Sequence, residues 1–361
     1  MQRWYERVTE GEGGVGGALL RPPLWIASRA YAALIAARNT RYDRSAGAVR
    51  RVGVPVVSIG NITTGGTGKT PMTIHVVERL RALGRNPAVV SRGYASADGI
   101  ADELALVQQA VPGVPCIANA DRVAGAAEAV RAHAADVIVL DDGFQHRRIG
   151  RDLDIVLLDA TAPFGGGHLL PRGRLREPVT SLRRCDAVII TRADAVDAAV
   201  LERLRAQAAE LSSHRPVLAC VHQPAPLRPL PGDFPADEPD AGMSVHLASG
   251  IAQPRAFERT VAALGLQIAG HTVFPDHHAY GWDDVMRIAA QARGGGAARI
   301  VVTEKDAVKL AALAANWPLP VDVLPVRIDF VGDDATIFGE LLADTLARCG
   351  TAAAQPGNLP S

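Results

Sequence analysis

Residues 56–71 read VVSIGNITTGGTGKTP, a hydrophobic run followed by a glycine- and threonine-rich turn that closes on Gly-Lys-Thr. This order predicts a buried strand that ends near Ile59, a loop over 60–68 and a helix that starts at Lys69 or Thr70. Glycines let backbone N–H groups approach an anion closely, and the helix N-terminus adds positive partial charge. We therefore expect a phosphate-binding loop, in which Lys69 reaches the β- and γ-phosphates of a nucleotide and the Thr70 hydroxyl holds Mg²⁺.

One position departs from the general phosphate-loop pattern, which has glycine where this chain has Thr63. Gly65 and Gly66 supply backbone freedom in its place. The alternative is an ordinary glycine-rich turn between a strand and a helix. The order of strand, Gly-Lys-Thr and helix favours the phosphate loop. The predicted nucleotide-binding residues are Gly60, Thr63, Thr64, Gly65, Gly66, Thr67, Gly68, Lys69 and Thr70.

A second segment, VIVLDDGFQH at residues 137–146, is a hydrophobic run that ends in two aspartates, Asp141 and Asp142. A carboxylate at such a strand end is the usual partner of a phosphate loop, because it binds the coordination shell of Mg²⁺. On its own this strand end is common, and a turn with solvated aspartates is the alternative. Its place after a phosphate loop favours metal binding.

Two other segments place charged residues near the expected phosphate site. The run SRGY at residues 91–94 follows a predicted strand directly, and the carboxyl ends of parallel strands line the ligand crevice. Asp102 lies a short loop later and can accept a proton from an attacking hydroxyl, although a solvated carboxylate pair with Glu103 is the simpler interpretation. The run LLPRGRLREP at 169–178 has three arginines that suit an anionic substrate. A charged surface loop is an equally good interpretation of this run. Glu177, within the same run, is a further candidate for the metal site.

The last candidate segments lie in the C-terminal third of the chain. Residues 274–278 read FPDHH, and residues 303–309 read TEKDAVK after the strong strand signal of residues 300–302. Adjacent histidines beside an aspartate can bind metal, but the other ligands of a zinc site are not evident in the sequence. We therefore favour acid–base or orienting work for FPDHH. The strand end places TEKD at the carboxyl edge of a sheet, where sites form.

The composition narrows the class of protein. The chain has 361 residues, of which 48% are hydrophobic and 21% charged, enough for a sizeable core in one large domain or two modest ones. The formal net charge is zero, so nothing indicates a nucleic-acid partner. The cysteines form no CxxC pair and no metal spacing, and we expect reduced thiols in a cytoplasmic enzyme. They are Cys116, Cys185, Cys220 and Cys349.

The N-terminal segment mixes apolar and basic residues. The sequence indicates neither a signal peptide nor a transmembrane helix. Between residues 18 and 51, apolar side chains such as Trp25 and Ile26 are interleaved with arginines, and a helix is predicted from Leu24 to about Ala37. An apolar face with tryptophan and flanking arginines suits a membrane interface. Taken by itself, the segment favours a helix packed on its own domain.

The rest of the chain alternates strands and helices, which indicates an α/β fold: a P-loop NTPase-like core with a largely parallel sheet and a smaller C-terminal α/β domain, preceded by the N-terminal helix. The proline-dense stretch 223–239 predicts a loop and a hinge. The expected divisions are an N-terminal segment 1–51, a core 52–222, a smaller domain 223–350 and a disordered tail 351–361. Expected strands are Pro55–Ile59, Pro87–Val90, Val137–Leu140, Ile155–Leu158, Ala187–Ile190, Val217–Val221, Val245–Ala248, Arg299–Val302 and Val321–Val326, and expected helices include Thr70–Leu83 and Ala120–Ala134.

Taken in order, GNITTGGTGKTP, SRGY, DDGFQHRRIGRDLDIVLLDA, LLPRGRLREP, FPDHH and TEKDAVK resemble the tetraacyldisaccharide 4′-kinase family, the lipid A 4′-kinases of Gram-negative bacteria. The match extends from the N-terminal segment to about residue 345, and the family's loop has threonine at the position of Thr63. The resemblance implies phosphorylation of the 4′-hydroxyl of a tetraacyl glucosamine disaccharide 1-phosphate, with ATP and Mg²⁺ as cofactors. It also implies an active site in a cleft between two domains, and a peripheral protein on the cytoplasmic face of the inner membrane. The membrane-interface interpretation of the N-terminal helix therefore becomes the preferred one.

The resemblance also assigns roles residue by residue. Asp102 matches the aspartate of the family's GDEP element and His277 the first histidine of FPDHH, which act as a base and its orienter. Here the element reads ADEL and follows a short loop, a departure that can displace Asp102. The predicted catalytic residues are Asp102, His277 and Lys69; the predicted metal ligands are Thr70, Asp141, Asp142 and Glu177; and the predicted substrate-binding residues are Arg92, Gln145, His146, Arg172, Arg174 and Arg176.

Two other classes of protein stay open. A P-loop kinase of a soluble metabolite needs no interfacial helix, and lipid or detergent should not affect its activity. A nucleotide-dependent switch or metallochaperone GTPase binds a partner protein, and the strand ends TRAD at 191–194 and TEKD at 303–306 faintly resemble a guanine-reading NKxD element without its asparagine. We expect no nucleic acid and no obligate protein partner. The sequence leaves open the acyl-chain preference, the oligomeric state and which of Arg122, Arg172, Arg174 and Arg176 meets the substrate 1-phosphate.

Overall fold

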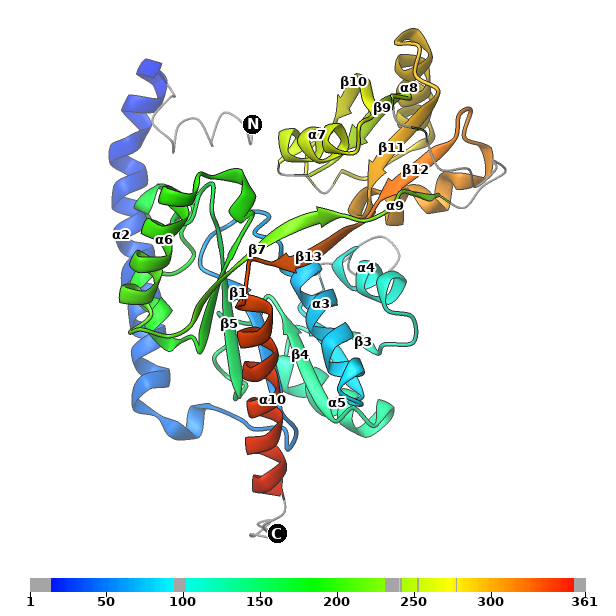
Figure 1. Ribbon diagram of the computed structural model, residues 1–361. Coiled ribbons are helices and arrows are strands. Elements are labelled where there is room, and N and C mark those ends of the chain that lie inside the picture. Colours follow the sequence, from blue (N-terminus) through cyan, green and yellow to red (C-terminus); the bar gives the residue numbers. More distant parts are fainter. Residues whose placement is uncertain are drawn as a thin grey trace. The chain divides into compact units, whose positions relative to one another are not determined.

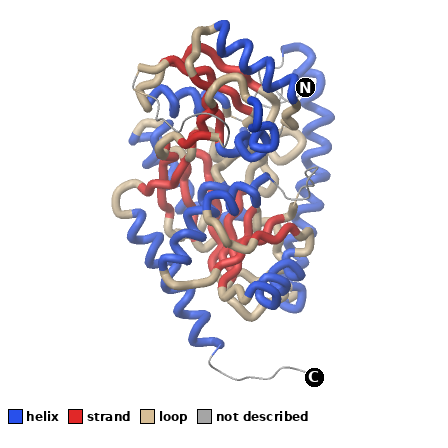
Figure 2. Tube along the Cα trace, turned by 90° about the vertical axis from the view of Figure 1, so that its right-hand side faces the viewer, coloured by secondary structure: helices blue, strands red, loops and turns tan. Residues whose placement is uncertain are grey.

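The computed structural model divides the chain into two compact units, which we describe separately (Figure 1). In both units, helices flank the strands (Figure 2). Unit 1 comprises residues 1–94, 111–221 and 329–361, and unit 2 comprises residues 95–110 and 222–328. The residues that the structure describes are 14–93, 102–230, 240, 242–251, 253–276 and 278–353.

Unit 1 is built on an eight-stranded sheet with the order β13-β7-β6-β5-β1-β4-β2-β3. The pairings from β7 to β3 are parallel. Every residue of β1, β4 and β5 is buried, as expected for central strands of a parallel sheet that is covered on both faces. The strands are β1 (Val56–Asn61), β2 (Pro87–Ser91), β3 (Cys116–Ala118), β4 (Val137–Asp141), β5 (Leu153–Asp159), β6 (Ala187–Thr191), β7 (Val217–Pro224) and β13 (Val326–Phe330).

Helices cover this sheet. The helix α3 contacts β1, β2 and β4, α5 contacts β2, β3 and β4, and α6 contacts β6. The α5 helix begins after Asp121, whose side chain caps it by accepting hydrogen bonds from the backbone N–H groups of Val123 and Ala124. The helices of unit 1 are α2 (Gly14–Arg44), α3 (Lys69–Ala82), α5 (Arg122–His133), α6 (Ala198–Leu211) and α10 (Asp334–Ala353), with 3₁₀ turns at Ala46–Ala48, Gly165–Gly167, Val179–Arg184 and Ala193–Ala195.

Unit 2 contains a five-stranded sheet with the order β10-β9-β11-β12-β8, parallel except for the short β8. Its core lies between this sheet and its helices and includes Phe274, Ile288 and Trp317. The strands are β8 (Arg228–Pro229), β9 (Ser244–Ser249), β10 (Gln267–Val273), β11 (Arg299–Thr303) and β12 (Val321–Leu324). The helices are α4 (Asp102–Ala110), α7 (Pro254–Ala263), α8 (Trp282–Gly294) and α9 (Glu304–Leu310), followed by a 3₁₀ turn at Ala311–Asn316.

The structure corrects the domain boundaries expected from the sequence. The expected boundary after residue 222 lies one residue from the change of unit between Val221 and His222, within β7, but the second unit ends at 328 instead of 350. Residues 329–361 return to unit 1, and residues 95–110 join unit 2. Both segments join their units through contacts with residues far away in the chain, as α4 does with α9, and a local sequence pattern does not predict such contacts. Within the expected tail, α10 continues to Ala353 and the residues beyond it lie outside those described.

Two elements also differ from expectation. The single strand expected at Val321–Val326 is two strands in two sheets, β12 and β13, separated by Pro325, which has no N–H to donate to a ladder. The N-terminal helix is longer than expected, because α2 continues through Pro22 and Pro23 despite the loss of two intrahelical hydrogen bonds. None of the helices in the described part of the chain has the length and hydropathy of a membrane span.

The packing of α3 predicts a pH dependence of stability. The ring of His75 lies 5.5 Å from that of Phe330 and 5.7 Å from that of Phe338, and burial, reinforced by Arg79, lowers the pKa of His75 to about 4. The unfolded chain binds this proton near pH 6.5, so the stability contributed by neutral His75 is present above that pH and is lost as the pH falls toward 4.

Between pH 7 and pH 5, the free energy of unfolding should fall less in a His75→Leu variant than in the native chain. We expect the two decreases to differ by roughly 1–2 kcal/mol. Urea unfolding at both pH values, followed by circular dichroism, measures the difference. His133→Gln is the matched control, since His133 is exposed at the end of α5. An identical pH response in His75→Leu and native chains would show that His75 contributes nothing to it.

Candidate active site

The loop predicted to bind phosphate follows β1 at the centre of the unit 1 sheet. Ile59 is paired in register with Asp141 of β4, so the carboxyl ends of β1 and β4 lie side by side. Gly65 and Gly66 are exposed, and α3 begins directly after Gly68, which has φ +85° and provides no side-chain cap. An α-helix N-terminus without a side-chain cap at the end of a glycine-rich loop is a site for an anion.

Two glycines, Gly60 and Gly65, are needed in this segment for different reasons. A Cβ atom on Gly60 would lie 2.7 Å from the backbone nitrogen of Phe144, so glycine is needed there for packing against the turn that follows β4. Gly65 has φ +110°, a backbone conformation that L side chains rarely adopt, and the Arg174 guanidinium lies against it. Gly60 therefore positions the loop within the sheet, whereas Gly65 shapes the loop itself.

Two of the predicted substrate-binding residues, Arg174 and Gln145, form hydrogen bonds with the backbone of the loop and of β1. Arg174 donates from Nη2 to the Thr64 carbonyl oxygen at 3.1 Å, and its own carbonyl oxygen accepts from the Thr64 N–H at 2.7 Å. The Gln145 amide donates to the Asn61 carbonyl oxygen at 2.8 Å. For Arg174 and Gln145 the structure thus gives a structural role, and their predicted contact with substrate stays a prediction.

Asp142 lies at the centre of the charged residues around the loop. Its Oδ1 is 3.7 Å from Lys69 Nζ and 2.8 Å from Arg176 Nη1. Its backbone has φ +57°, an uncommon conformation for a residue other than glycine. Burial alone would raise the pKa of Asp142, but Lys69 and Arg176 outweigh it and hold the pKa below its usual range. The carboxylate is therefore ionised at neutral pH.

The oxygen donors at this edge fit Mg²⁺. Asp141 is buried at the end of β4 and Asp142 follows it, while Thr70 lies in the first turn of α3 beside Lys69. Two carboxylates and a hydroxyl are the hard ligands that Mg²⁺ takes when substrate phosphates complete its coordination. Within the described residues no group of three or more His, Cys, Asp or Glu side chains is placed to hold a metal alone.

Glu177 has other partners. Its carboxylate is completely buried and accepts from Arg38 Nη2 at 2.8 Å, from Asn39 Nδ2 at 3.3 Å and from Arg184 Nη2 at 2.5 Å. Arg38 and Asn39 belong to α2, so Glu177 fastens this helix to the loop 169–178. This arrangement does not indicate a metal role for Glu177, because both of its carboxylate oxygens already accept hydrogen bonds from cationic or amide donors. Metal binding by Glu177 stays a prediction, and it would require these hydrogen bonds to break.

The α2 helix presents two different faces. Ser28 donates to the Leu169 carbonyl oxygen at 2.9 Å and Tyr31 donates to the Arg176 carbonyl oxygen at 3.0 Å, so one face packs on the arginine-rich loop. The opposite face is apolar and exposed, with Trp25, Ile26 and Leu34 at 49%, 64% and 70% exposure. The helix thus carries hydrophobic side chains outward while its inner face holds the backbone of the loop.

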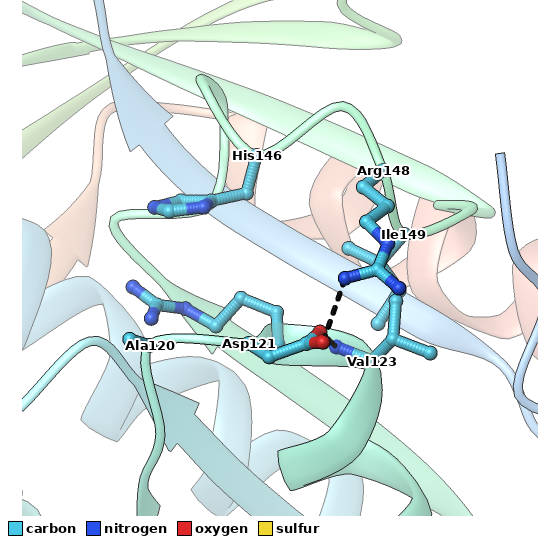
Figure 3. Close-up of a pocket in the computed structure, with 7 residues that line it drawn as sticks. Ala120, Asp121, Val123, His146, Arg148 and Ile149 are labelled. Carbon is cyan, nitrogen blue, oxygen red and sulfur yellow. Dashed lines mark hydrogen bonds and ion pairs between the residues drawn. The ribbon is translucent and has the colours of Figure 1, made fainter. Parts of the chain in front are cut away.

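A small hollow of about 200 Å³ lies next to the turn after β4. In Figure 3, His146 lies across this hollow from Ala120 and Asp121, and Arg148 pairs with Asp121 at 2.7 Å. Arg122 also lines it and is 3% exposed. Burial, reinforced by the positive charge of Arg122, lowers the pKa of His146 to about 4, so His146 is neutral at physiological pH.

The predicted base and its orienter belong to unit 2. Asp102 is the first residue of α4, and α4 contacts α9. His277 and the side chain of Asp102 lie outside the described residues. The residues beside His277 are held in place, because Asp276 accepts from Lys305 Nζ at 2.7 Å and the His278 carbonyl oxygen accepts from Lys309 Nζ at 3.2 Å. Lys305 and Lys309 of TEKDAVK therefore hold Asp276 and His278 of FPDHH, two contacts that the sequence alone did not predict.

Two further predicted substrate-binding residues are placed by the structure, which also shows two contacts that the sequence did not predict. Arg92 is exposed directly after β2, and Arg172 is half-buried in the 169–178 loop. Sequence reasoning did not find the contact of Arg38 with Glu177 or that of Arg192 with the phosphate loop. Each partner is more than 120 residues away, so no local spacing could have indicated it.

The fold and the loop define a P-loop NTPase-like protein: a parallel α/β sheet whose central strand leads through a glycine-rich turn into Gly-Lys-Thr. The model of the tetraacyldisaccharide-1-P 4′-kinase family matches residues 20–347. The chain belongs to this family.

Relatives of known name agree with this assignment. The chain is 44% identical over 349 residues to the tetraacyldisaccharide 4′-kinase of Anaeromyxobacter sp. (strain Fw109-5), and the alignment covers 90% of each of the two chains. It is 39% identical over 323 residues to the enzyme of that name from Syntrophus aciditrophicus, covering 82% of this chain and 86% of the relative. A solved structure of LpxK from Aquifex aeolicus in complex with ATP has the same fold, with a TM-score of 0.69, 24% identity and coverage of 91% of this chain and 99% of that one.

Proposed function

We propose that this protein transfers the γ-phosphate of ATP to the 4′-hydroxyl of a tetraacyldisaccharide 1-phosphate, a step of lipid A biosynthesis. The observation that carries the proposal is the phosphate loop of unit 1, with Lys69 beside Asp142, in a chain of the tetraacyldisaccharide-1-P 4′-kinase family. Relatives at 39–44% identity carry the name of this kinase.

The proposed roles follow from the chemistry of phosphoryl transfer, in which positioning and charge stabilisation dominate. The loop N–H groups and the N-terminus of α3 receive the phosphates, and Lys69 stabilises negative charge on the transferred group. Asp141, Asp142 and Thr70 would hold Mg²⁺, which when bound neutralises charge between the β- and γ-phosphates. Asp102 accepts the proton of the attacking sugar hydroxyl, and His277 orients it.

Arg176 has a place in this scheme through Asp142. Its guanidinium donates to both carboxylate oxygens of Asp142, at 2.8 and 3.0 Å. Binding of a cation to Asp142 would compete with this pair, which would release the Arg176 guanidinium toward an anionic group. Of the arginines considered for the substrate 1-phosphate, Arg122 lines the same hollow as His146, and we propose that this hollow receives an anionic group.

An acceptor-dependence assay tests the proposed function. ADP release from Mg²⁺-ATP is measured in detergent with the tetraacyldisaccharide 1-phosphate, with free glucosamine or with no acceptor. We expect release above background only with the lipid. Equal release with glucosamine would favour a kinase of soluble metabolites, and release that depends on GTP but not ATP would favour a nucleotide switch.

We also propose that the protein associates peripherally with the cytoplasmic face of the inner membrane through α2. The exposed side chains Trp25, Ile26 and Leu34 form an apolar surface, and the Arg29 guanidinium lies 5.9 Å from the centre of the Trp25 ring. Tryptophan beside a basic residue suits the boundary between headgroups and acyl chains. A lipid substrate has to be reached from this boundary.

A triple variant with serine at positions 25, 26 and 34 should bind vesicles at least about tenfold more weakly than the native chain, because each buried apolar side chain contributes about 1.5–3 kcal/mol. Flotation with vesicles of phosphatidylethanolamine and phosphatidylglycerol measures the bound fraction. Serine at Ala33, Ala36 and Ala37, exposed on the same helix, is the matched control and should leave binding intact. Equal flotation of both triple variants would refute a role for this apolar face.

A further inference from the structure

We propose that Thr191 and Arg192, at the end of β6, are positioning residues of the phosphate loop. The proposal rests on the proposed function, since it concerns the same nucleotide site. Thr191 Oγ1 donates to the Thr67 carbonyl oxygen at 3.1 Å, and Arg192 Nη2 donates to the Gly66 carbonyl oxygen at 2.8 Å. Two successive carbonyl groups of the loop are therefore held by two successive residues that lie more than 120 positions later in the chain.

Holding these oxygens fixes the direction of the loop's peptide groups. In a trans peptide the C=O and the following N–H point in opposite directions. The bonds from Arg192 and Thr191 thus fix the peptide planes that carry the N–H groups of Thr67 and Gly68. Gly66 is exposed and has no side chain to restrict it, so without these bonds the loop would lose more conformational entropy when it orders around phosphates.

Arg192 is itself held in position. Its guanidinium forms an ion pair with Asp159, a carboxylate that is 5% exposed at the end of β5. The other Asp159 oxygen accepts from the Thr161 N–H at 3.0 Å and from its hydroxyl at 2.7 Å. Arg192 also has φ +55°, an uncommon conformation for a residue other than glycine. Such conformations persist where the surroundings determine them strongly, which supports a role for the side chain.

The loop is thereby supported from two sides. Arg174 bonds the Thr64 carbonyl oxygen at 3.1 Å from one strand connection, and Arg192 bonds the Gly66 carbonyl oxygen at 2.8 Å from another. These contacts explain the TRAD run at residues 191–194 differently from its faint resemblance to a guanine-reading element. Its threonine and arginine act on the loop backbone, and this contact requires no particular nucleobase.

Replacement of Arg192 by glycine tests the proposal. Because φ +55° suits glycine, Arg192→Gly removes the guanidinium without straining the backbone. We expect Mg²⁺-ATP to bind about tenfold more weakly, as for the loss of a charge-assisted hydrogen bond. The KM for ATP should rise by a similar factor, while the KM for the lipid and kcat at saturating ATP change less than about threefold.

Three further variants make the result specific. His214→Gly is the matched control, since His214 also has positive φ, at +60°, and is exposed on a turn; it should bind ATP like the native chain. Arg192→Lys should restore part of the affinity, because an ammonium group can donate to the Gly66 oxygen. Asp159→Asn should weaken ATP binding in the native background but add little to Arg192→Gly, since the two residues act through one contact.

Isothermal titration with Mg²⁺-ATP, with thermal unfolding to verify folding, measures these effects independently of kinase activity. Native-like ATP affinity in folded Arg192→Gly would overturn the proposal, as would a KM that rises for lipid instead of ATP. If the native chain binds ATP without phosphorylating the lipid, the proposed function fails, while the titrations still decide the role of Arg192.

Discussion

Replacing Lys69 with alanine is expected to reduce phosphoryl transfer by about 10³-fold or more, because the variant loses the cation that stabilises charge on the transferred group. Lys69 is the first residue of α3, and its ammonium group lies 3.7 Å from Asp142; in the proposed function it binds the phosphates. Initial rates of ADP release with saturating lipid and varied ATP measure the loss.

Arg79→Ala is the matched control for Lys69→Ala. It removes a positive charge from the same helix, three turns beyond the loop, where the side chain is exposed. Its rate should stay within about twofold of the native rate, as for a surface substitution away from special features. Equal rates for Lys69→Ala and Arg79→Ala would mean that the Gly-Lys-Thr turn is not the site of transfer.

Replacing Asp102 with alanine is expected to lower kcat by about 10²–10⁴-fold, the usual contribution of a general base, while ATP affinity changes less than about twofold. The separation of the two effects has a structural reason. The phosphate loop is part of unit 1, whereas Asp102 begins α4 of unit 2, and α4 contacts α9 of the same unit. Steady-state kinetics with ATP titrations on the same preparations measures both quantities.

Glu103→Gln is the matched control for Asp102→Ala, because it neutralises the neighbouring carboxylate on the same helical turn. The altered ADEL element and the short loop before it make this comparison necessary, since a shifted helix could present Glu103 in place of Asp102. Turnover equal to the native value in Asp102→Ala would remove Asp102 from the catalytic role. A large loss in Glu103→Gln together with a small one in Asp102→Ala would transfer that role to Glu103.

The fold could be predicted where buried apolar runs decide the structure. The central strands β1, β4 and β5 are wholly buried, so their hydrophobic runs gave the strands to within a few residues. β10 was missed, because only one of its seven residues is buried and it has no apolar run. The three-residue β3 was missed as well, since it is too short for a pattern.

The site could be predicted only in part, and the reason is again physical. The motif residues Lys69 and Asp142 lie together because β1 and β4 are adjacent, which strand-end logic predicts. The role of Glu177 could not be predicted in this way, because its partners in α2 are 138 and 139 residues away. Long-range ion pairs follow from tertiary packing and leave no periodic signal in the sequence.

The most direct test of the central claim is the mass of the lipid product. Tetraacyldisaccharide 1-phosphate is incubated with Mg²⁺-ATP and the native chain in detergent, and in parallel with Lys69→Ala. We predict a gain of one phosphate on the lipid with the native chain, located at the 4′-position by fragmentation, and almost none with Lys69→Ala. No added phosphate from a native chain that binds ATP would contradict the account, and would mean that the acceptor is a different molecule.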